Sequence, residues 1–327
     1  MVDVTVIIPT HNRRQLLART LDSVLAQHDV DLDVVVVDDG GADDVGSLVA
    51  CLDDARVRLV RHPESRGVSA ARNSGISQAT APWVAFVDDD DLWAPTKLRS
   101  QLDALAARPS ARWSCTGAVN IDAQCRISGW HAPPPDPSVG DLLLSQNWIP
   151  GGGSGVLASR DLTLAIGGFD EALSNIADWD FYIRLGLTAP MAPVFRPHLG
   201  YYVHTQGMAH GVERSAREYR YLDVKYAAER ARRGIQLNEE VWLQYLAGLA
   251  YNAGRRRAGL RFHGEMLVRL HRWRSLLSIG VGLAPERVRR ARARRYVPPA
   301  MPPDWVDEAQ GWLSPYTSGW LDQTVEP

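Results

Sequence analysis

Four short apolar runs, each followed by a more polar stretch, constrain the fold of this chain more than any other feature. The runs lie at residues 4–8, 33–37, 57–60 and 84–87. Each has the length and composition of a buried strand, and helical spacing of apolar residues predicts helices over 14–27, 43–53 and from 67 onwards. Strands that alternate with helices form doubly wound, mainly parallel sheets flanked by helices. The sequence therefore predicts an α/β fold.

Polar side chains follow three of these predicted strands, at the point where each strand ends. They are Thr10-His11-Asn12-Arg13, Asp38-Asp39 and the four aspartates Asp88 to Asp91. In a parallel sheet, ligands bind beyond the carboxyl ends of the strands. Each stretch alone could be a loop or a helix cap, but their convergence predicts a ligand site.

The four consecutive aspartates need a cationic partner, because adjacent anions repel and a buried, unpaired carboxylate is costly. Hard oxygen ligands in small number favour Mg²⁺ or Mn²⁺ shared with a substrate phosphate over an all-protein calcium cage. The alternatives are a solvated acidic turn or N-caps for a helix that starts near residues 95–96.

Five motifs together resemble family 2 glycosyltransferases with the GT-A fold, in both order and spacing. They are Val4 to Arg13, the Asp38-Asp39-Gly40 strand end, Gly67 to Asn73, Phe86 to Asp91, and Gly167-Gly168-Phe169-Asp170 followed by Asp178-Trp179-Asp180. The resemblance covers residues 3–210 and is specific for the family, but not for the donor or the acceptor.

The resemblance implies how a nucleotide would be held. Pro9, Thr10 and Asn12 would lie in the loop that wraps the base. Asp39 would accept a hydrogen bond from the base N–H, which suits uracil or thymine, and Arg72 would reach toward the base or the diphosphate. The implied donor is a nucleoside-diphosphate sugar, with UDP as the expected nucleotide.

The resemblance also implies different roles for the four consecutive aspartates. Asp88 would face the ribose, Asp90 would ligate the Mn²⁺ or Mg²⁺ ion that bridges both phosphates, and Asp89 would assist through water. The role of Asp91 stays open. His204 corresponds to a position near the metal or the diphosphate and is the second predicted metal ligand, although a histidine at a strand end often has a purely structural role.

A second carboxylate must take the proton from the acceptor hydroxyl. The resemblance implies Asp178 for this base and an inverting, single displacement, with Asp180 as the fallback. The structural alternative makes Asp178 a helix N-cap. The segment Gly151 to Ser154 resembles the one that lies under the donor sugar, but it could equally be a turn.

Three regions are expected: a catalytic domain, a basic helical extension and a tail. Their bounds are 1–210 (halves 1–95 and 96–210), 211–296 and 297–327. The extension holds 20 Lys and Arg against 8 Asp and Glu, in a chain of net charge −2. The segment 276–295 could rest on an anionic membrane surface. It could also be a solvated helical face, or one that pairs with the acidic tail or the acidic catalytic half. The extension is also expected to select the acceptor or to form a homodimer.

Composition and short motifs limit the expected location of the protein and the kinds of site it can hold. No run of about 18 apolar residues exists, no charged and apolar leader precedes the first strand, and the three cysteines lack a CxxC pattern. A cytoplasmic protein is therefore expected, and a membrane contact through 276–295 would make it peripheral at the inner face of the membrane. No nucleic-acid motif is present. The acceptor stays open among a glycan, a lipid-linked intermediate, a peptide and a small natural product.

Two other function classes compete with this interpretation. A nucleotidyltransferase that makes sugar nucleotides would need a glycine-rich phosphate loop after the first strand, and residues 9–12 contain no glycine. A non-catalytic binding module would need no base at Asp178. The Gly153 to Ala158 stretch fits a dinucleotide-binding pattern, but no strand is predicted before it. Farther along, a hairpin is expected over 111–131 and two strands over 192–196 and 200–204.

Overall fold

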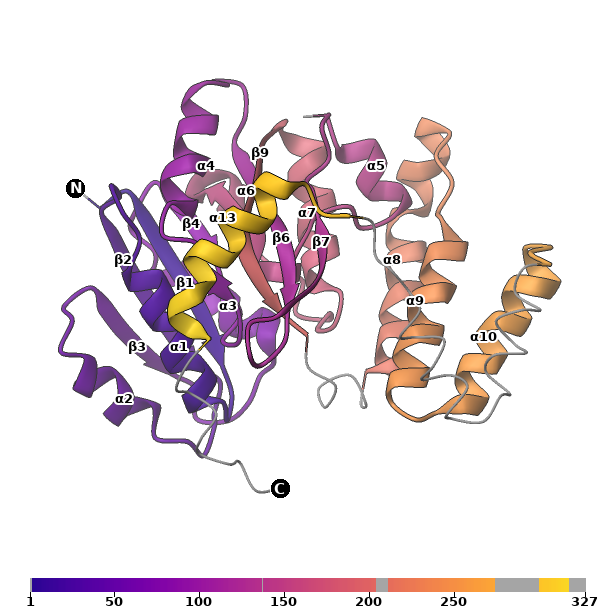
Figure 1. Cartoon of the computed structure of the whole chain (residues 1–327). Helices are drawn as coiled ribbons and strands as arrows, with labels where there is room; N and C mark the ends of the chain where they lie inside the picture. Colours follow the sequence, from indigo (N-terminus) through magenta and orange to yellow (C-terminus); the bar gives the residue numbers. More distant parts are fainter. Residues whose placement is uncertain (1, 137, 204–210, 274–299, 318–327) are drawn as a thin grey trace. The chain divides into compact units, whose positions relative to one another are not determined.

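The computed structural model contains two compact units (Figure 1). The described residues are 2–136, 138–203, 211–273 and 300–317. The first unit contains the described parts of 1–143, 148–203 and 301–317, and the second contains 144–147 and the described part of 204–300. Two predicted features, His204 and the membrane-facing segment 276–295, lie outside the described residues.

The first unit is built on one nine-stranded sheet. Its strands are β1 (Val4–Thr10), β2 (Leu32–Asp38), β3 (Val57–Arg61), β4 (Trp83–Phe86), β5 (Leu92–Trp93), β6 (Trp113–Ile121), β7 (Ile127–His131), β8 (Val156–Ser159) and β9 (Met191–Tyr202). The order is β3-β2-β1-β4-β8-β6-β9-β5, with β7 paired to β6. The four predicted N-terminal strands form the parallel portion β3-β2-β1-β4, which confirms the α/β assignment.

The other half of the sheet is mixed rather than parallel. Strand β8 runs antiparallel to both β4 and β6, β9 runs parallel to β6, and β5 runs antiparallel to β9. The predicted hairpin is present as β6 and β7. The parallel half therefore follows the predicted doubly wound pattern, while the half built after residue 91 does not.

Side chains along each strand point alternately to the two faces of the sheet. In the parallel half both sets are apolar, and helices cover both faces. The helices of the first unit are α1 (Arg14–Leu25), α2 (Val45–Leu52), α3 (Val68–Gln78), α4 (Lys97–Ala106), α6 (Arg160–Ala165), α7 (Ala177–Thr188) and α13 (Pro303–Leu313), with the 3₁₀ turns η1 (Gly152–Gly155) and η3 (Ser314–Tyr316). Helix α5 (Gly140–Ser145) begins in the first unit, and its last two residues belong to the second. Val34 and Val36 belong to the core cluster that includes Leu21 of α1. The alternate residues Val35 and Val37 pack with Ala71 of α3 instead. The sheet is thus buried on both sides, and its strand ends are left to carry the site.

The prediction of two strands at 192–196 and 200–204 is wrong, since β9 is one continuous strand. Pro193 and Pro197 lie within this strand, although proline cannot donate to a sheet ladder. The structure accommodates them with an irregularity: Val194 pairs with Thr116, but the next residue, Gly117, pairs with Pro197. A β-bulge of this kind tolerates proline within a strand.

The described part of the predicted tail packs on the first unit. Helix α13, yellow in Figure 1, lies against β9. Glu308 accepts a hydrogen bond from Arg196 at 3.0 Å, and its other oxygen lies 3.0 Å from His198 Nε2. The indole of Trp305 covers Gly117 so closely that an added Cβ would lie 2.4 Å from the ring. Residues 301–317 are therefore part of this unit and not a separate tail.

We expect Trp305→Ala to destabilise the first unit by about 3–5 kcal/mol, because it leaves a ring-sized cavity over Gly117. Trp305 is only 6% exposed and packs edge-on against Trp130. Chemical unfolding followed by circular dichroism measures the change. The matched control is Trp148→Ala, since Trp148 is 46% exposed and its loss should cost little. Equal losses in the two variants would contradict this packing role.

The second unit is helical over its described residues, as the sequence predicts for 211–273. Its helices are α8 (Val212–Arg233), α9 (Glu239–Asn252) and α10 (Arg256–Arg269). The Asn238 side chain caps α9 by accepting a hydrogen bond from the Val241 N–H. Tyr219 of α8 stacks on Trp242 of α9, with ring centroids 4.5 Å apart. Within the described residues, no helix combines the length and apolarity needed to cross a bilayer.

Candidate active site

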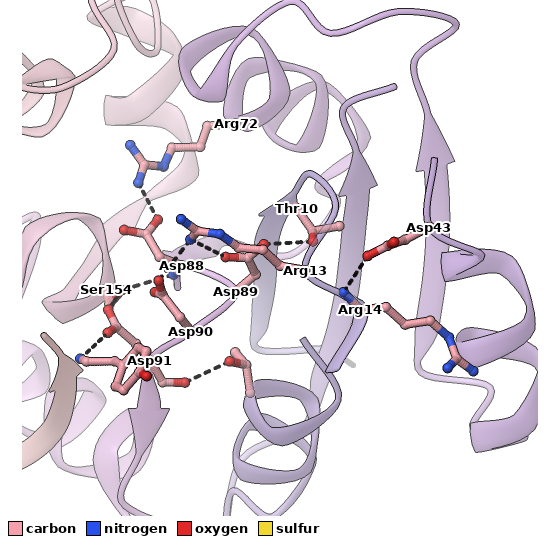
Figure 2. Close-up of polar contacts among 12 residues, drawn as sticks. Thr10, Arg13, Arg14, Asp43, Arg72, Asp88, Asp89, Asp90, Asp91 and Ser154 are labelled. Carbon is pink, nitrogen blue, oxygen red and sulfur yellow. Dashed lines mark hydrogen bonds and ion pairs between the residues drawn. The ribbon is translucent and has the colours of Figure 1, made fainter. Parts of the chain in front are cut away.

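The predicted strand ends meet at one edge of the sheet, around the aspartate run (Figure 2). Thr10 pairs in register with Asp38, so β1 and β2 end side by side. The Thr10 hydroxyl donates to Asp89 Oδ2 at 2.7 Å, and this buried bond joins the end of β1 to the chain after β4. The stretch that begins at Thr10 is thus in direct contact with both of the other predicted stretches.

The four aspartates differ in how far their side chains reach solvent. The Asp88 side chain is 30% exposed and that of Asp90 is 10% exposed, whereas the Asp89 side chain is 6% exposed and Asp91 is fully buried. Only a carboxylate that reaches solvent can bind a ligand that arrives from solution. The division agrees with the expectation that Asp88 and Asp90 serve the ligand.

Asp91, whose role the sequence left open, is a structural centre. It is fully buried and accepts hydrogen bonds from the Ser154 hydroxyl and from the Tyr202 N–H, the latter at 2.8 Å. The same Ser154 oxygen accepts from the Asp88 N–H at 2.9 Å. Burial raises the pKa of the Asp91 carboxyl well above its usual value. Asp91 therefore ties η1 and β9 to the aspartate run.

Arg13 lies between two of the carboxylates. Its Nη1 donates to Asp89 Oδ1 at 3.1 Å and to Asp90 Oδ2 at 2.9 Å (Figure 2). Burial and the neighbouring charge of Asp90 raise the pKa of Asp89 to about 7, against the opposing effect of Arg13. Asp89 is thus held within the protein by Thr10 and Arg13, and its predicted contact through water stays a prediction.

Arg72 lies on α3, next to Gly153 of η1. Its Nη2 donates to Asp88 Oδ1, and its guanidinium carbon lies 4.9 Å from the centre of the Phe169 ring. Arg72 is only 4% exposed. The predicted reach toward the base or the diphosphate stays a prediction, because in this structure the guanidinium holds Asp88.

We expect Gly153→Ala to impair donor binding, since a Cβ at Gly153 would lie 2.4 Å from Arg72 Nη2 and 3.4 Å from Asp88 Oδ1. The methyl group would push Arg72 off Asp88, and losing such a charged hydrogen bond costs roughly 1.5–3 kcal/mol, or about 10–100-fold in affinity. Calorimetry with UDP measures the loss. Gly264→Ala on helix α10 of the second unit is the control, since its Cβ would meet no atom within 4 Å and its backbone has no positive φ. Unchanged affinity in Gly153→Ala would contradict the expected effect.

Asp178 lies inside the first turn of α7 and is not a helix cap, because the N-cap position is Ile176. A Cβ added to Gly152 would lie 4.0 Å from Asp178 Oδ2 and 4.0 Å from Asp88 Oδ2, so both carboxylates border the same space. Burial raises the pKa of Asp178 to about 6, although the charge of Arg72 opposes the shift. A carboxyl of this kind is suited to proton transfer near neutral pH.

The fallback base, Asp180, has a structural role. It is fully buried, and its Oδ2 accepts from both Nε and Nη2 of Arg184, at 2.9 and 2.6 Å. Arg184 also donates to the carbonyl oxygens of Ile166 and Gly168. The pair therefore fixes the turn before α7, and Asp178 remains the candidate base.

Asp39 organises a loop. Its carboxylate accepts from the Ser65 hydroxyl at 2.8 Å, from the N–H groups of Arg66 and Gly67 at 2.9 and 2.8 Å, and from His62 Nδ1 at 2.7 Å. Burial would raise the pKa of Asp39, but these hydrogen bonds outweigh it and lower the pKa. Both carboxylate oxygens are engaged, so a base N–H would have to share or replace one of these donors.

Pro9 and Asn12 shape the loop after β1. Pro9 is buried opposite Val37 in β2. Asn12 adopts a left-handed backbone conformation with φ 55°, and its Oδ1 accepts from the Ala42 N–H at 2.6 Å. The two loops that follow β1 and β2 are therefore joined, as a binding site for a nucleotide base would require.

The oxygens at this site fit a divalent cation that a substrate helps to hold. Among the residues that the structure describes, no three His, Cys, Asp or Glu side chains are placed to hold a metal by themselves. Asp90 offers a hard oxygen ligand, and a cation, the Arg13 guanidinium, already lies 2.9 Å from it. Mg²⁺ and Mn²⁺ are commonly bound by one or two carboxylates together with substrate phosphates. Asp90 fits that pattern, and the other predicted ligand, His204, lies outside the described residues.

Three contributors to the site were not assigned roles from the sequence. Arg13 and Ser154 lie within predicted stretches, but nothing in their spacing indicated ion pairing with Asp90 or bridging to Asp91. Tyr182 donates its hydroxyl to the Gly152 carbonyl and so fixes the turn beside Asp178. The dinucleotide pattern at 153–158 is excluded, because η1 leads into strand β8 and not into a helix.

Comparison with known proteins agrees with this geometry. Residues 5–124 match the family model of glycosyl transferase family 2. The chain is 42% identical over 101 residues to the succinoglycan biosynthesis protein ExoO of Rhizobium meliloti, a match over 31% of this chain and 29% of ExoO. It is 25% identical over 140 residues to an Escherichia coli protein, the UDP-Glc:α-D-GlcNAc-diphosphoundecaprenol β-1,3-glucosyltransferase WfaP, over 43% of this chain and 55% of WfaP. These matches span less than two thirds of either relative.

Solved structures share the fold across nearly the whole chain. The Staphylococcus aureus TarS fragment 1–349 superposes with a TM-score of 0.56 at 19% identity, covering 96% of this chain and 91% of that one. The mannosyltransferase PcManGT of Pyrobaculum calidifontis, solved with GDP-Man and Mn²⁺, gives a TM-score of 0.51 at 19% identity, covering 94% and 86%. Fold, family model and site geometry point the same way: residues 5–124 match glycosyl transferase family 2, and the fold is of the GT-A type.

Proposed function

We propose that this chain transfers a sugar from a nucleoside-diphosphate donor to an acceptor hydroxyl in a single, inverting displacement. The observation that carries the proposal is the pair of carboxylates, Asp88 and Asp178, that border the space in front of Gly152. One belongs to the acidic run that faces the donor, and the other has a pKa of about 6. A site that must both bind a sugar nucleotide and accept a proton needs this combination.

The residues at the strand ends hold the donor. The loops of Asn12 and Asp39 would enclose the base, and Asp88, oriented by Arg72, would hydrogen-bond the ribose. A divalent ion, Mn²⁺ or Mg²⁺, would supply positive charge to the diphosphate leaving group at Asp90. The protein's own part is to hold Asp90 at the open edge of the sheet, which the buried Asp91 does through Ser154 and Tyr202.

Asp178 takes the proton of the acceptor. At neutral pH a carboxyl with a pKa of about 6 is mostly ionised, so it can accept a hydroxyl proton as the oxygen attacks the sugar. Attack by the acceptor on the face opposite the leaving group inverts the anomeric centre, and no covalent intermediate is required. Tyr182 supports this step by fixing the turn at Gly152.

Relatives indicate which substrates to test first. WfaP is named for UDP-Glc and a diphosphoundecaprenol-linked acceptor, and TarS 1–349 has been solved with UDP and with UDP-GlcNAc. We therefore propose a UDP-linked donor, and a lipid-linked acceptor ahead of a free glycan, a peptide or a small natural product. The predicted membrane contact of 276–295 would suit such an acceptor, and it remains a prediction, as does a homodimer.

A donor screen tests the proposed function. The purified chain is incubated with UDP-, GDP- and TDP-linked sugars, with Mn²⁺ and with an undecaprenyl-diphosphate-linked sugar as acceptor, and release of the nucleoside diphosphate is measured. Acceptor-dependent release of UDP supports the proposal. Binding of a sugar nucleotide without any turnover, across all acceptors tested, would instead favour the binding module. Release of inorganic pyrophosphate from a nucleoside triphosphate and a sugar phosphate would favour the nucleotidyltransferase.

A further inference from the structure

Two arginines form ion pairs with the aspartate run, and they differ in how firmly they are held. Arg72 pairs with Asp88 and is 4% exposed, with Gly153 next to its Nη2 and the Phe169 ring 4.9 Å from its guanidinium carbon. The Arg13 side chain pairs with Asp89 and Asp90 and is 38% exposed. Arg72 is therefore a fixed counter-charge, whereas Arg13 lies at the open rim of the site and can change partners.

The position of Arg13 conflicts with a divalent cation on Asp90. A single nitrogen, Nη1, donates to Asp90 Oδ2 at 2.9 Å and to Asp89 Oδ1 at 3.1 Å. A metal ion ligated by Asp90 would lie close to this guanidinium, and two like charges at such a separation repel strongly even at the effective dielectric of a protein surface. Arg13 and the metal therefore compete for the same carboxylate.

A donor diphosphate offers Arg13 a better partner. Phosphate oxygens match the forked geometry of a guanidinium, and paired hydrogen bonds of this kind are stronger than the single-nitrogen contact seen here. Arg13 is the N-cap residue of α1, directly after the loop that would enclose the nucleotide. A rotation of its side chain alone would carry the charge from the carboxylates toward a diphosphate bound beyond the strand ends.

We propose that Arg13 is a resident counter-cation for Asp90 that occupies the metal position until the donor diphosphate draws it away. This inference rests on the proposed function. It implies that the metal and the donor bind together: without nucleotide, Arg13 neutralises Asp90 and disfavours the metal, and with nucleotide, Arg13 neutralises the diphosphate and releases Asp90. Arg13 is thus a specificity device against metal binding in the absence of substrate.

Mn²⁺ titration of the full chain, followed by the electron paramagnetic resonance signal of free Mn²⁺, tests the inference. In the absence of nucleotide, Arg13→Gln is expected to bind Mn²⁺ at least about tenfold more tightly than the wild type, a gain of about 1.4 kcal/mol. The same variant is expected to bind UDP at least about tenfold more weakly when Mn²⁺ saturates the site. Arg13→Lys keeps the charge and should stay close to the wild type in nucleotide-free Mn²⁺ affinity.

The neighbouring Arg14 provides the matched control. Figure 2 shows Arg13 directed into the aspartate run and Arg14 directed away from it, and Arg14 Nε donates to the Asp44 carbonyl at 3.1 Å. Arg14→Gln removes the same charge from the same helix end and should leave Mn²⁺ affinity unchanged. If Arg13→Gln and Arg14→Gln increased Mn²⁺ affinity equally, the increase would be explained by general surface charge, and the inference would be overturned.

The remaining outcomes separate the inference from the proposed function. Wild-type protein that binds Mn²⁺ with UDP, together with an Arg13→Gln variant whose nucleotide-free Mn²⁺ affinity is unchanged or weaker, would overturn the inference alone. UDP affinity that is the same in Arg13→Gln and in the wild type would contradict the transfer of Arg13 to the diphosphate. Absence of Mn²⁺ binding by every variant, with and without UDP, would contradict the metal-dependent function, and the inference with it.

Discussion

Asp178→Asn is expected to transfer sugar roughly 10²–10⁴-fold more slowly than the wild-type chain, which is the range that a positioned general base contributes. Asparagine has nearly the same shape as aspartate, so Trp179 and Arg72 keep their neighbours, but the amide cannot accept the acceptor proton. The loss should appear in kcat, while affinity for UDP stays close to that of the wild type, because Asp178 is not part of the nucleotide-binding loops.

Rates of acceptor-dependent UDP release measure this effect. Asp141→Asn on α5 is the control, since Asp141 is exposed and lies outside the site. The pH profile gives an independent readout: kcat/KM in the wild type should fall below an apparent pKa of about 6, and this acidic limb should disappear from the residual rate of Asp178→Asn. Full activity in the variant would show that Asp178 is not the base.

The same substitution should stabilise the fold at neutral pH. The pKa of Asp178 is about 6 in the folded chain and 3.8 for an unperturbed group, so the folded state binds the proton more tightly than the unfolded state. Ionisation of Asp178 therefore lowers the free energy of unfolding progressively between about pH 4 and pH 6, and the full cost is present at pH 7. Asp178→Asn removes this cost, on the order of 1–3 kcal/mol, and the advantage should vanish below about pH 4.

Asp91→Ala is expected to destabilise the first unit by about 3 kcal/mol or more, the largest stability effect within the aspartate run. The substitution leaves the Tyr202 N–H and the Ser154 hydroxyl without their acceptor, in a site that is fully buried. Each unsatisfied buried group costs about 1–3 kcal/mol, and the missing carboxyl adds a cavity. Asp91→Asn, which retains an acceptor oxygen, should recover much of the loss.

Urea unfolding of three variants separates the roles of neighbouring aspartates. Asp91→Ala should unfold at a clearly lower urea concentration, whereas Asp90→Ala, at the open edge, should unfold near the wild-type midpoint. Asp90→Ala should instead lose the effect of Mn²⁺ on UDP binding. Equal stability of the Asp90 and Asp91 variants would contradict the division of the run into a ligand-facing and a structural carboxylate.

The parallel half of the sheet was predictable because its signals are local. Each N-terminal strand is a continuous apolar run, each is followed by a helix, and parallel packing then brings the strand ends of Thr10, Asp39 and Asp88 to one edge. The motif resemblance added roles for these residues, and the structure brings them together. Asp178 was located in the same way, through its motif and not through its spacing from the other carboxylates.

The second half could not be predicted in this way, because its contacts join residues far apart in the chain. Nothing near Pro193 or Pro197 shows that a bulge opposite Gly117 keeps β9 continuous. Likewise, the docking of α13 depends on Trp305 fitting over a glycine almost two hundred residues earlier. The pairing of Arg13 with Asp90 is also a tertiary contact, so the sequence could place Arg13 in the loop but not reveal its partner.

Calorimetric titration of UDP into the full chain, with Mn²⁺ and with EDTA, tests most directly whether the aspartate edge is a metal-assisted nucleotide-sugar site. We expect UDP to bind with Mn²⁺, to bind at least about tenfold more weakly in EDTA, and to lose this metal effect in Asp90→Asn. Failure of UDP to bind under either condition, or equal binding with Mn²⁺ and with EDTA in both the wild type and Asp90→Asn, would contradict it.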